Sequence, residues 1–449
     1  MSPIGRPPQS TGSAGRQALS EDTMKIHIQN GRLIDPANNV DAKRDLFIAA
    51  GKIVGVGSAP ADFHANRLID AAGQIVCPGL IDLAVRLREP GYEYKATLES
   101  ELAAAVAGGV SSLCCLPDTD PPLDEPGLVE MLKHRAKSLN QSRVYPLGAL
   151  TMGLKGQRLT EMAELTDAGC VAFTHADHPL VDTLVLSRAL DYAVTFGFAV
   201  WLRPQDAFLA AGGVAHDGEI ATRLGLAAIP ATAETIALST ILQLVRANRA
   251  RVHLCRLSTA QGVEMVKAAK QEGLPITCDV DIHHLHLCDR DLGYFDSNCN
   301  LMPPLRGLGD REALRRGLKE GTIDAVCSNH SPVDDDAKQV PFGEAEPGAI
   351  GLELLLPLTL KWAREMDLSL ADAVATITSA PARVLGIDAG HLAVGHAADV
   401  CVFDPQQVWR VDAKALKSQG RNTPFVGFEM EGRVRYTLVE GHVVHERQG

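Results

Sequence analysis

The chain has 449 residues, 46% of them hydrophobic and 22% charged, which allows a large core and two structural units. Its formal net charge of −12 disfavours nucleic-acid binding, because contact with phosphates needs a basic face. The longest uncharged run, residues 102–117, is shorter than the roughly 18 residues of a membrane span, so we expect no membrane partner.

The N-terminal residues and the cysteines indicate the cellular compartment of the protein. Residues 1–23 are rich in Ser, Gly and Pro and lack an apolar block, so we expect a disordered tail and no secretory signal. Ten cysteines are scattered through apolar stretches such as residues 113–116, and none forms a C-x-x-C pair. Buried free thiols of this kind are typical of a reducing compartment, so we expect a cytoplasmic protein.

Short alternating strands are predicted at both ends of the chain. At the N-terminal end they cover residues 25–33, 45–56 and 67–76, with turn residues such as Asn30-Gly31. The same pattern returns at residues 398–403 and 433–444. We therefore expect one small β-sandwich domain that is composite, built from residues 24–77 and 390–449.

Between these segments, residues 78–389 alternate short apolar runs with amphipathic helices. Strands are predicted at residues 78–85, 110–117, 143–150, 170–175, 199–203, 251–257, 275–281 and 324–328. Helices are predicted at residues 96–107, 125–139, 160–168, 182–196, 233–248, 259–272, 310–320, 352–365 and 370–379. Eight strand–helix units predict an α/β fold of the (β/α)8 TIM-barrel type, with functional side chains at the carboxyl ends of the strands. A doubly wound sheet is the alternative, but no GxGxxG follows the first strand.

Distinctive motifs stand where these strands end. They include Leu87-Arg88-Glu89-Pro90-Gly91, Leu116-Pro117-Asp118-Thr119-Asp120, Leu257-Ser258-Thr259, Pro303-Pro304-Leu305-Arg306 and Asn329-His330-Ser331-Pro332. From about Met24 to the C-terminus, the chain resembles the dihydroorotases of the amidohydrolase superfamily. The resemblance implies a barrel with a composite β domain. It also implies that active members use zinc-bound hydroxide to hydrolyse and close a dihydropyrimidine ring.

The positions that hold zinc in active members of that family carry other residues here. They are a His-x-His pair on the first strand, two acids after the fourth, one His each on the fifth and sixth, and an acid on the eighth. In chain order they align with Ala84, Arg86, His175, Ala176, Arg203, Arg256 and Asn329. Arginine offers no lone pair to a metal, alanine has no ligand atom, and asparagine cannot act as a base.

We therefore expect a degenerate site with no catalytic residues, no bound metal and no cofactor. Inward-pointing arginines need anionic partners, for which Asp118, Asp177, Asp206 and Asp281 are the candidates. A zinc site rebuilt from other histidines is the alternative, and the histidines near strand ends are His175, His178, His253, His283, His284 and His330.

Three further positions are interpreted as vestigial substrate contacts. Arg88 occupies the place where the family binds the substrate carboxylate, and it is either a leftover anion contact or a structural ion pair. Asp118 and Met302 stand where the family has asparagines, and an acid at 118 would repel an anionic substrate.

The resemblance extends to inactive dihydroorotase homologues that assemble with the catalytic chain of aspartate carbamoyltransferase in some bacteria. The sequence therefore predicts a non-catalytic subunit of pyrimidine biosynthesis, in a hetero-oligomer with that chain and with self-association. A divergent active amidohydrolase with an altered metal site is the alternative, and an anion-binding sensor is a third.

Overall fold

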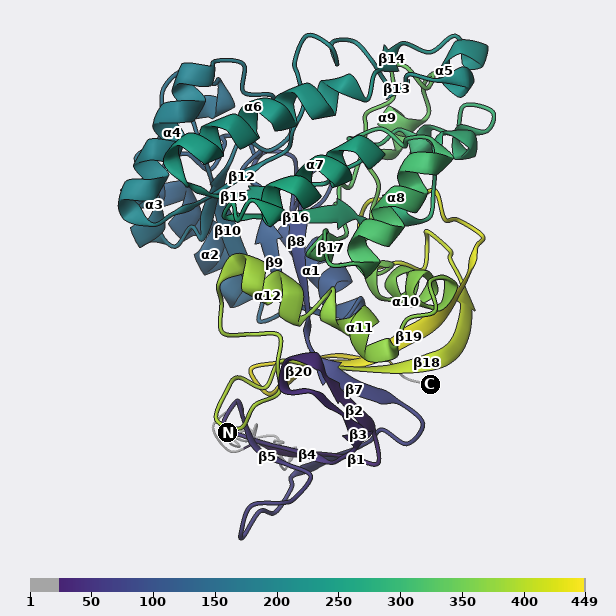
Figure 1. Cartoon of the computed structure of the whole chain (residues 1–449). Coiled ribbons are helices and arrows are strands. Elements are labelled where there is room, and N and C mark those ends of the chain that lie inside the picture. Colours follow the sequence, from purple (N-terminus) through teal and green to yellow (C-terminus); the bar gives the residue numbers. More distant parts are fainter. Residues whose placement is uncertain (1–23, 448–449) are drawn as a thin grey trace, which may run out of the picture.

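Eight parallel strands form a nearly closed barrel in the computed structural model, which describes residues 24–447 (Figure 1). In chain order they are β8 (Leu80–Val85), β9 (Val110–Cys115), β10 (Arg143–Ala149), β11 (Ala172–Thr174), β12 (Ala199–Leu202), β15 (Arg251–Leu254), β16 (Ile276–Asp281) and β17 (Ala325–Cys327). A parallel bridge between Val85 and His330 joins the first strand to the segment that follows the last. The predicted TIM barrel is confirmed, whereas the predicted tail at residues 1–23 lies outside the described residues.

Helices connect the strands and surround the barrel (Figure 1). They include α1 (Leu98–Ala107), α2 (Pro126–Ser138), α3 (Met162–Ala168), α4 (Thr183–Phe196), α6 (Thr232–Asn248), α7 (Ala260–Gln271), α8 (Leu308–Lys319), α10 (Leu355–Glu365), α11 (Leu370–Ala375) and α12 (Ser379–Leu385). Side-chain oxygens set where several begin: Thr97 accepts from the Ser100 backbone N–H, and Thr259 from that of Gly262. Two short helices, α5 (Glu219–Leu224) and α9 (Asp335–Lys338), and the two-residue strands β13 (Ala215–His216) and β14 (Ala228–Ile229) lie in connecting loops.

The single helix predicted at residues 370–379 is wrong. The structure ends α11 at Ala375 and starts α12 at Ser379, with a non-helical Thr378 between them. Pro381 explains the break, because its ring would clash with the carbonyl four residues earlier in a continuous helix. In the first turn of α12 the same proline is tolerated.

Two further sheets lie below the barrel (Figure 1). Four strands, in the order β5-β4-β1-β6, come from the N-terminal end: β1 (Lys25–Gln29), β4 (Leu46–Ala49), β5 (Lys52–Val56) and β6 (Arg67–Asp70). Six strands, in the order β20-β19-β18-β7-β2-β3, come from both ends: β2 (Arg32–Asp35), β3 (Val40–Lys43), β7 (Ile75–Pro78), β18 (Val400–Arg410), β19 (Glu429–Val439) and β20 (His442–Glu446).

The three predicted N-terminal segments, and the one at residues 433–444, each span two strands and a turn. The two strands of each segment are separated at Asn30, Gly51, Gly73 and Gly441, which all have positive φ. Residues from both ends share one apolar core, to which Ile26, Ile48, Val400 and Leu438 contribute.

The cysteines are all buried and free, which confirms the prediction of buried thiols. Among the described residues, no helix combines the length and the apolar character that crossing a membrane requires.

Candidate functional site

Three arginines from different strand ends converge on one carboxylate at the mouth of the barrel. Arg86, Arg203 and Arg256 follow β8, β12 and β15, and Asp177 follows β11. These positions meet because the carboxyl ends of parallel strands lie at the same edge of the sheet. The structure thus brings the predicted positions 86, 203 and 256 together, around an acid one residue beyond the predicted Ala176.

Asp177 holds the three guanidinium groups through both of its oxygens. Its Oδ1 lies 2.6 Å from Nε of Arg203 and 3.0 Å from Nη2 of Arg256. Its Oδ2 accepts a hydrogen bond from Nη2 of Arg86, and its backbone carbonyl accepts one from Nη2 of Arg203 at 2.8 Å. The arginine side chains are 7%, 3% and 1% exposed for Arg86, Arg203 and Arg256, so these are buried ion pairs.

Other polar groups complete the network around the arginines. Nε of Arg86 donates to Asp118 at 2.7 Å, and its Nη1 donates to Ser331 Oγ at 2.8 Å. Nη1 of Arg256 donates to Oδ1 of Asn329 at 2.8 Å. The amide of Asn329 donates in turn to Asp281 at 3.0 Å and to the backbone carbonyl of residue 302 at 3.2 Å.

The prediction that acids pair with the arginines is therefore confirmed for Asp118 and Asp177 and wrong for the other two candidates. Asp206 accepts from the backbone N–H groups of residues 208 and 209 and so shapes a turn. Asp281 bonds to His283, at 2.6 Å from its Nδ1, and to Asn329. Both acids accept hydrogen bonds from neighbouring groups and form no ion pair with the three arginines.

The network keeps Asp177 ionised. Burial by itself would raise the pKa of Asp177, but the charges of Arg256, Arg86 and Arg203 outweigh burial and hold that pKa far below its usual range. Burial likewise opposes the charge of Arg86, yet Asp118 and Asp177 raise the pKa of Arg86 overall. Three cations face two carboxylates, so the network carries one excess positive charge.

A zinc ion of the kind that the resemblance implies for active relatives does not fit this mouth. Guanidinium groups occupy three ligand positions and have no lone pair to donate. Ala84 and Ala176, both buried, add no ligand atom, and both groups of the Asn329 amide are hydrogen-bonded. The remaining carboxylate, Asp177, is held by three cations that would repel a divalent ion.

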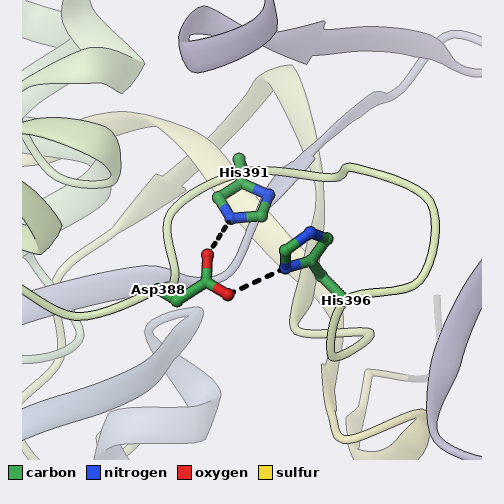
Figure 2. Close-up of side chains that lie close together, drawn as sticks. All are labelled: Asp388, His391 and His396. Atoms are coloured by element: carbon green, nitrogen blue, oxygen red, sulfur yellow. Dashed lines mark hydrogen bonds and ion pairs between the residues drawn. The ribbon is translucent and has the colours of Figure 1, made fainter.

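The spare histidines contact several other side chains, and two of these histidines share one acid. His175 bonds to Thr151 at 2.8 Å, His253 to Asp279 at 3.0 Å, and the buried His330 to Glu101. His283 and His284 both face Asp281. Among residues 24–447, three potential ligand residues gather closely enough for a metal at a different place, Asp388, His391 and His396 (Figure 2).

The backbone is strained at the strand ends. Arg88, Ala176, Arg256 and Asn329 adopt φ values of 61°, 50°, 55° and 47°. Residues other than glycine rarely adopt this left-handed region, which costs of order 1–3 kcal/mol each and clusters at functional sites. Alanine and arginine gain nothing from this conformation locally, so the surrounding contacts hold them in it.

The three positions interpreted as vestigial substrate contacts bond to other groups of this chain. Nε of Arg88 donates to the backbone carbonyl of Pro332 at 2.9 Å, and its Nη2 lies 3.7 Å from Glu346. These contacts support the interpretation of Arg88 as a structural ion pair. Asp118 holds Arg86, and Met302 contributes its carbonyl to the Asn329 amide.

A cavity of about 160 Å³ opens beside the network. Its lining includes His175, His178, Arg203 and Gln205, with apolar side chains from α4 and α6 on the far side. The Arg203 guanidinium donates to Gln205, which also lines the cavity, and to the backbone carbonyl of Asp177. The charge of Arg203 at the edge of the cavity is paired with the carboxylate of Asp177.

Two members of the network, Ser331 and Gln205, were not among the predicted site residues. Ser331 belongs to the Asn329-His330-Ser331-Pro332 motif, and Gln205 stands two residues beyond Arg203. Only their closeness in sequence to predicted positions could have pointed to these two residues. Their role depends on where the arginine side chains point, which no spacing rule supplies.

Asp82, inside the barrel on β8, gives a testable pH dependence. Burial raises the pKa of Asp82 to about 6, although Oδ1 accepts from the N–H groups of Ala84 and Ser328. The unfolded chain loses this proton near pH 4. The native state therefore loses stability as pH rises from about 4 to 6 and stays less stable above that. Asp82→Asn has no such proton, so its stability relative to wild type should rise by roughly 2 kcal/mol between pH 4 and pH 7.

Urea denaturation of both proteins at the two pH values measures this. Any constant cost of burying the new amide cancels in the comparison. An equal difference in stability at both pH values would contradict the prediction.

Comparisons with known proteins agree on a family. The sequence model described as "Dihydro-orotase-like" matches residues 73–262, and "Amidohydrolase family" matches residues 214–445. A "Dihydroorotase-like protein" of Pseudomonas aeruginosa is 48% identical over 94% of this chain and 100% of its own length. A protein of Syntrophotalea carbinolica named "Dihydroorotase" is 41% identical over 94% of this chain and 99% of its own.

Solved structures agree with the fold. An L-hydantoinase (dihydropyrimidinase) from Arthrobacter aurescens superposes with a TM-score of 0.83 at 25% identity. The match covers 94% of this chain and 96% of that one.

Proposed function

Because this chain belongs to the dihydroorotase-like family of amidohydrolases, we propose that it is a non-catalytic member that supports the aspartate carbamoyltransferase catalytic chain. One observation supports the proposed loss of catalysis. Three buried arginines that pair with one aspartate occupy the mouth of the barrel, where the family's chemistry takes place. Such a network supplies neither a metal ligand set nor a free general base.

The pairing of the buried arginines with acids supports a structural role for this network. A buried charge without a partner is costly, and here each arginine has an acid within 3.0 Å. Ser331, Gln205 and Asn329 take up further donors. These contacts link the three arginines to two acids and three neutral polar side chains, although Nε of Arg256 has no hydrogen-bond partner among the described residues.

The proposed partner follows from the resemblance to inactive homologues that assemble with this carbamoyltransferase chain. Exposed apolar side chains offer a place for contact: Val181, Phe208 and Ile236 are 57%, 79% and 49% exposed. All three also line the 160 Å³ cavity. An apolar patch around a hollow is typical of a protein-binding surface.

Co-expression with the aspartate carbamoyltransferase catalytic chain, followed by size-exclusion chromatography with light scattering, tests the assembly. We expect the two chains to elute together and the carbamoyltransferase activity to exceed that of its chain alone. The same measurement on this chain alone shows whether it associates with itself. Separate elution at micromolar concentration would contradict the proposal.

Two surface variants locate the contact. Phe208→Asp should weaken the complex, because a charge would be buried in an apolar interface. Val408→Asp is the matched control, since Val408 is 59% exposed on β18, outside the patch. A complex that survives Phe208→Asp would place the contact elsewhere.

A divergent active amidohydrolase is the second candidate. It is favoured by relatives named "Dihydroorotase" that are 40–41% identical to this chain over 94% of its length. Stoichiometric zinc together with ring closure of carbamoyl aspartate by the purified chain would establish it in place of the first.

A further inference from the structure

A second cluster of titratable side chains, Asp388, His391 and His396, lies in the loop between α12 and β18 (Figure 2). One oxygen of Asp388 lies 2.9 Å from Nε2 of His391, and the other lies 2.9 Å from Nδ1 of His396. Figure 2 shows both rings turned toward the carboxylate between them. One potential ligand atom from each residue lies within 4.8 Å of the other two.

The donor set suits a divalent transition metal. Imidazole nitrogen and carboxylate oxygen bind Zn²⁺, Ni²⁺ and Cu²⁺, whereas Mg²⁺ and Ca²⁺ prefer oxygen alone. Ligand atoms about 2.1 Å from one ion are roughly 3.0–3.4 Å apart. The 2.9 Å contacts go to the two different oxygens of Asp388, and the three ligand atoms lie within 4.8 Å of one another. The side chains must therefore rotate so that one carboxylate oxygen and both ring nitrogens surround the ion.

The backbone holds this loop in place. Gly395 donates to Ile53 at 2.8 Å, and Ile53 donates to His396 at 3.0 Å, which ties the loop to β5. Leu392 donates to the carboxylate of Asp35 at 2.7 Å. Gly390 has a φ of 73°, and a Cβ there would lie 2.6 Å from the carbonyl oxygen of Thr378. Ligands on an anchored loop lose little conformational freedom when they bind an ion.

Exposure leaves the site open to an incoming ion. The side chains of Asp388, His396 and His391 are 73%, 41% and 16% exposed, so water can complete the coordination shell. Asp388 offers a carboxylate, which is ionised at neutral pH. A metal at Nε2 of His391 moves the ring proton to Nδ1 and forfeits the 3.3 Å bond from the Ala393 N–H. That loss makes the site weaker than a buried structural zinc site.

We propose that Asp388, His391 and His396 form a binding site for a divalent transition-metal ion, with water as the remaining ligands. The ion joins the segment that leaves α12 to the part of the loop that pairs with β5. It therefore fixes the junction between the barrel's last helix and the N-terminal sheet, and it stabilises the folded chain by mass action.

Zinc binding by the full chain tests the site after chelation and removal of the chelator. Native mass spectrometry should show one Zn²⁺ per chain, and Zn²⁺ should raise the Tm by a few degrees where Mg²⁺ does not. His391→Gln and His396→Gln should each lose the bound ion and the rise in Tm. His64→Gln, at an exposed histidine outside the cluster, should keep both.

Cu²⁺ gives a readout that a change in folding cannot imitate. Electron paramagnetic resonance of the copper-loaded chain should show a site with two nitrogen ligands in wild type, and this signal should be absent from either single variant. Failure of the wild-type chain to bind Zn²⁺, or equal Zn²⁺ binding by both variants, would overturn the assignment.

Discussion

Asp177→Asn should lower the free energy of unfolding by about 3–5 kcal/mol, because it removes the one carboxylate shared by three buried arginines. Only Asp118 would then remain to face three guanidinium groups. The wild-type carboxylate has a depressed pKa, so its contribution is complete above about pH 4 and declines as pH falls. Urea denaturation at pH 7 measures the loss.

Two comparisons make this prediction specific to charge balance. Adding Arg203→Gln to Asp177→Asn removes one unpaired cation, so the double variant should recover part of the lost stability. Asp120→Asn changes an exposed acid in the loop after β9 and should cost less than about 0.5 kcal/mol. A loss below about 1 kcal/mol for Asp177→Asn, or strict additivity in the double variant, would contradict the shared-acid interpretation.

Turnover should be absent even with zinc in excess. Enzymes accelerate their reactions at least about 10⁶-fold, so an active dihydroorotase assayed in parallel should exceed this chain by orders of magnitude. The physical reason is that Arg86, Arg203 and Arg256 occupy ligand positions and cannot bind a metal. Ring closure of carbamoyl aspartate and ring opening of dihydroorotate are both measured, with a zinc-only blank.

The assay needs protein from a host that lacks its own dihydroorotase. His391→Gln provides a second control, since it removes the proposed loop site and leaves the barrel mouth untouched. Turnover above the blank that chelation abolishes in both wild type and His391→Gln would establish the active alternative.

The barrel could be predicted from the sequence because its elements are long and periodic. The apolar residues of α4, such as Val185, Ala189 and Ala193, recur every four residues and are buried together. Elements of two residues, such as β13 and β14, carry no period at all, and they were missed. The terminal strands were merged although Asn30-Gly31 lies within residues 25–33, and the alternation changes phase there, from buried Ile26 and Ile28 to buried Leu33.

The sequence predicted where the residues of the candidate site lie along the strands, but not which side chains contact one another. Spacing from known motifs placed Arg86, Arg203 and Arg256 at strand ends, and parallel topology explains why they meet. Four acids were equal candidates as partners, since nothing in the sequence indicates which carboxylate has spare acceptors. Asp281 was excluded only by the position of His283, and Asp206 only by the turn that follows it.

The sheet shared by both ends of the chain has a consequence for biosynthesis. Strand β7 pairs with β2 on one side and with β18 on the other, and residues 79–399 separate β7 from β18. While the ribosome makes that stretch, β7 keeps an unfilled edge bearing the apolar Ile75, Val76 and Cys77. A nascent chain that stalls before residue 400 therefore presents a template for pairing with a neighbouring chain.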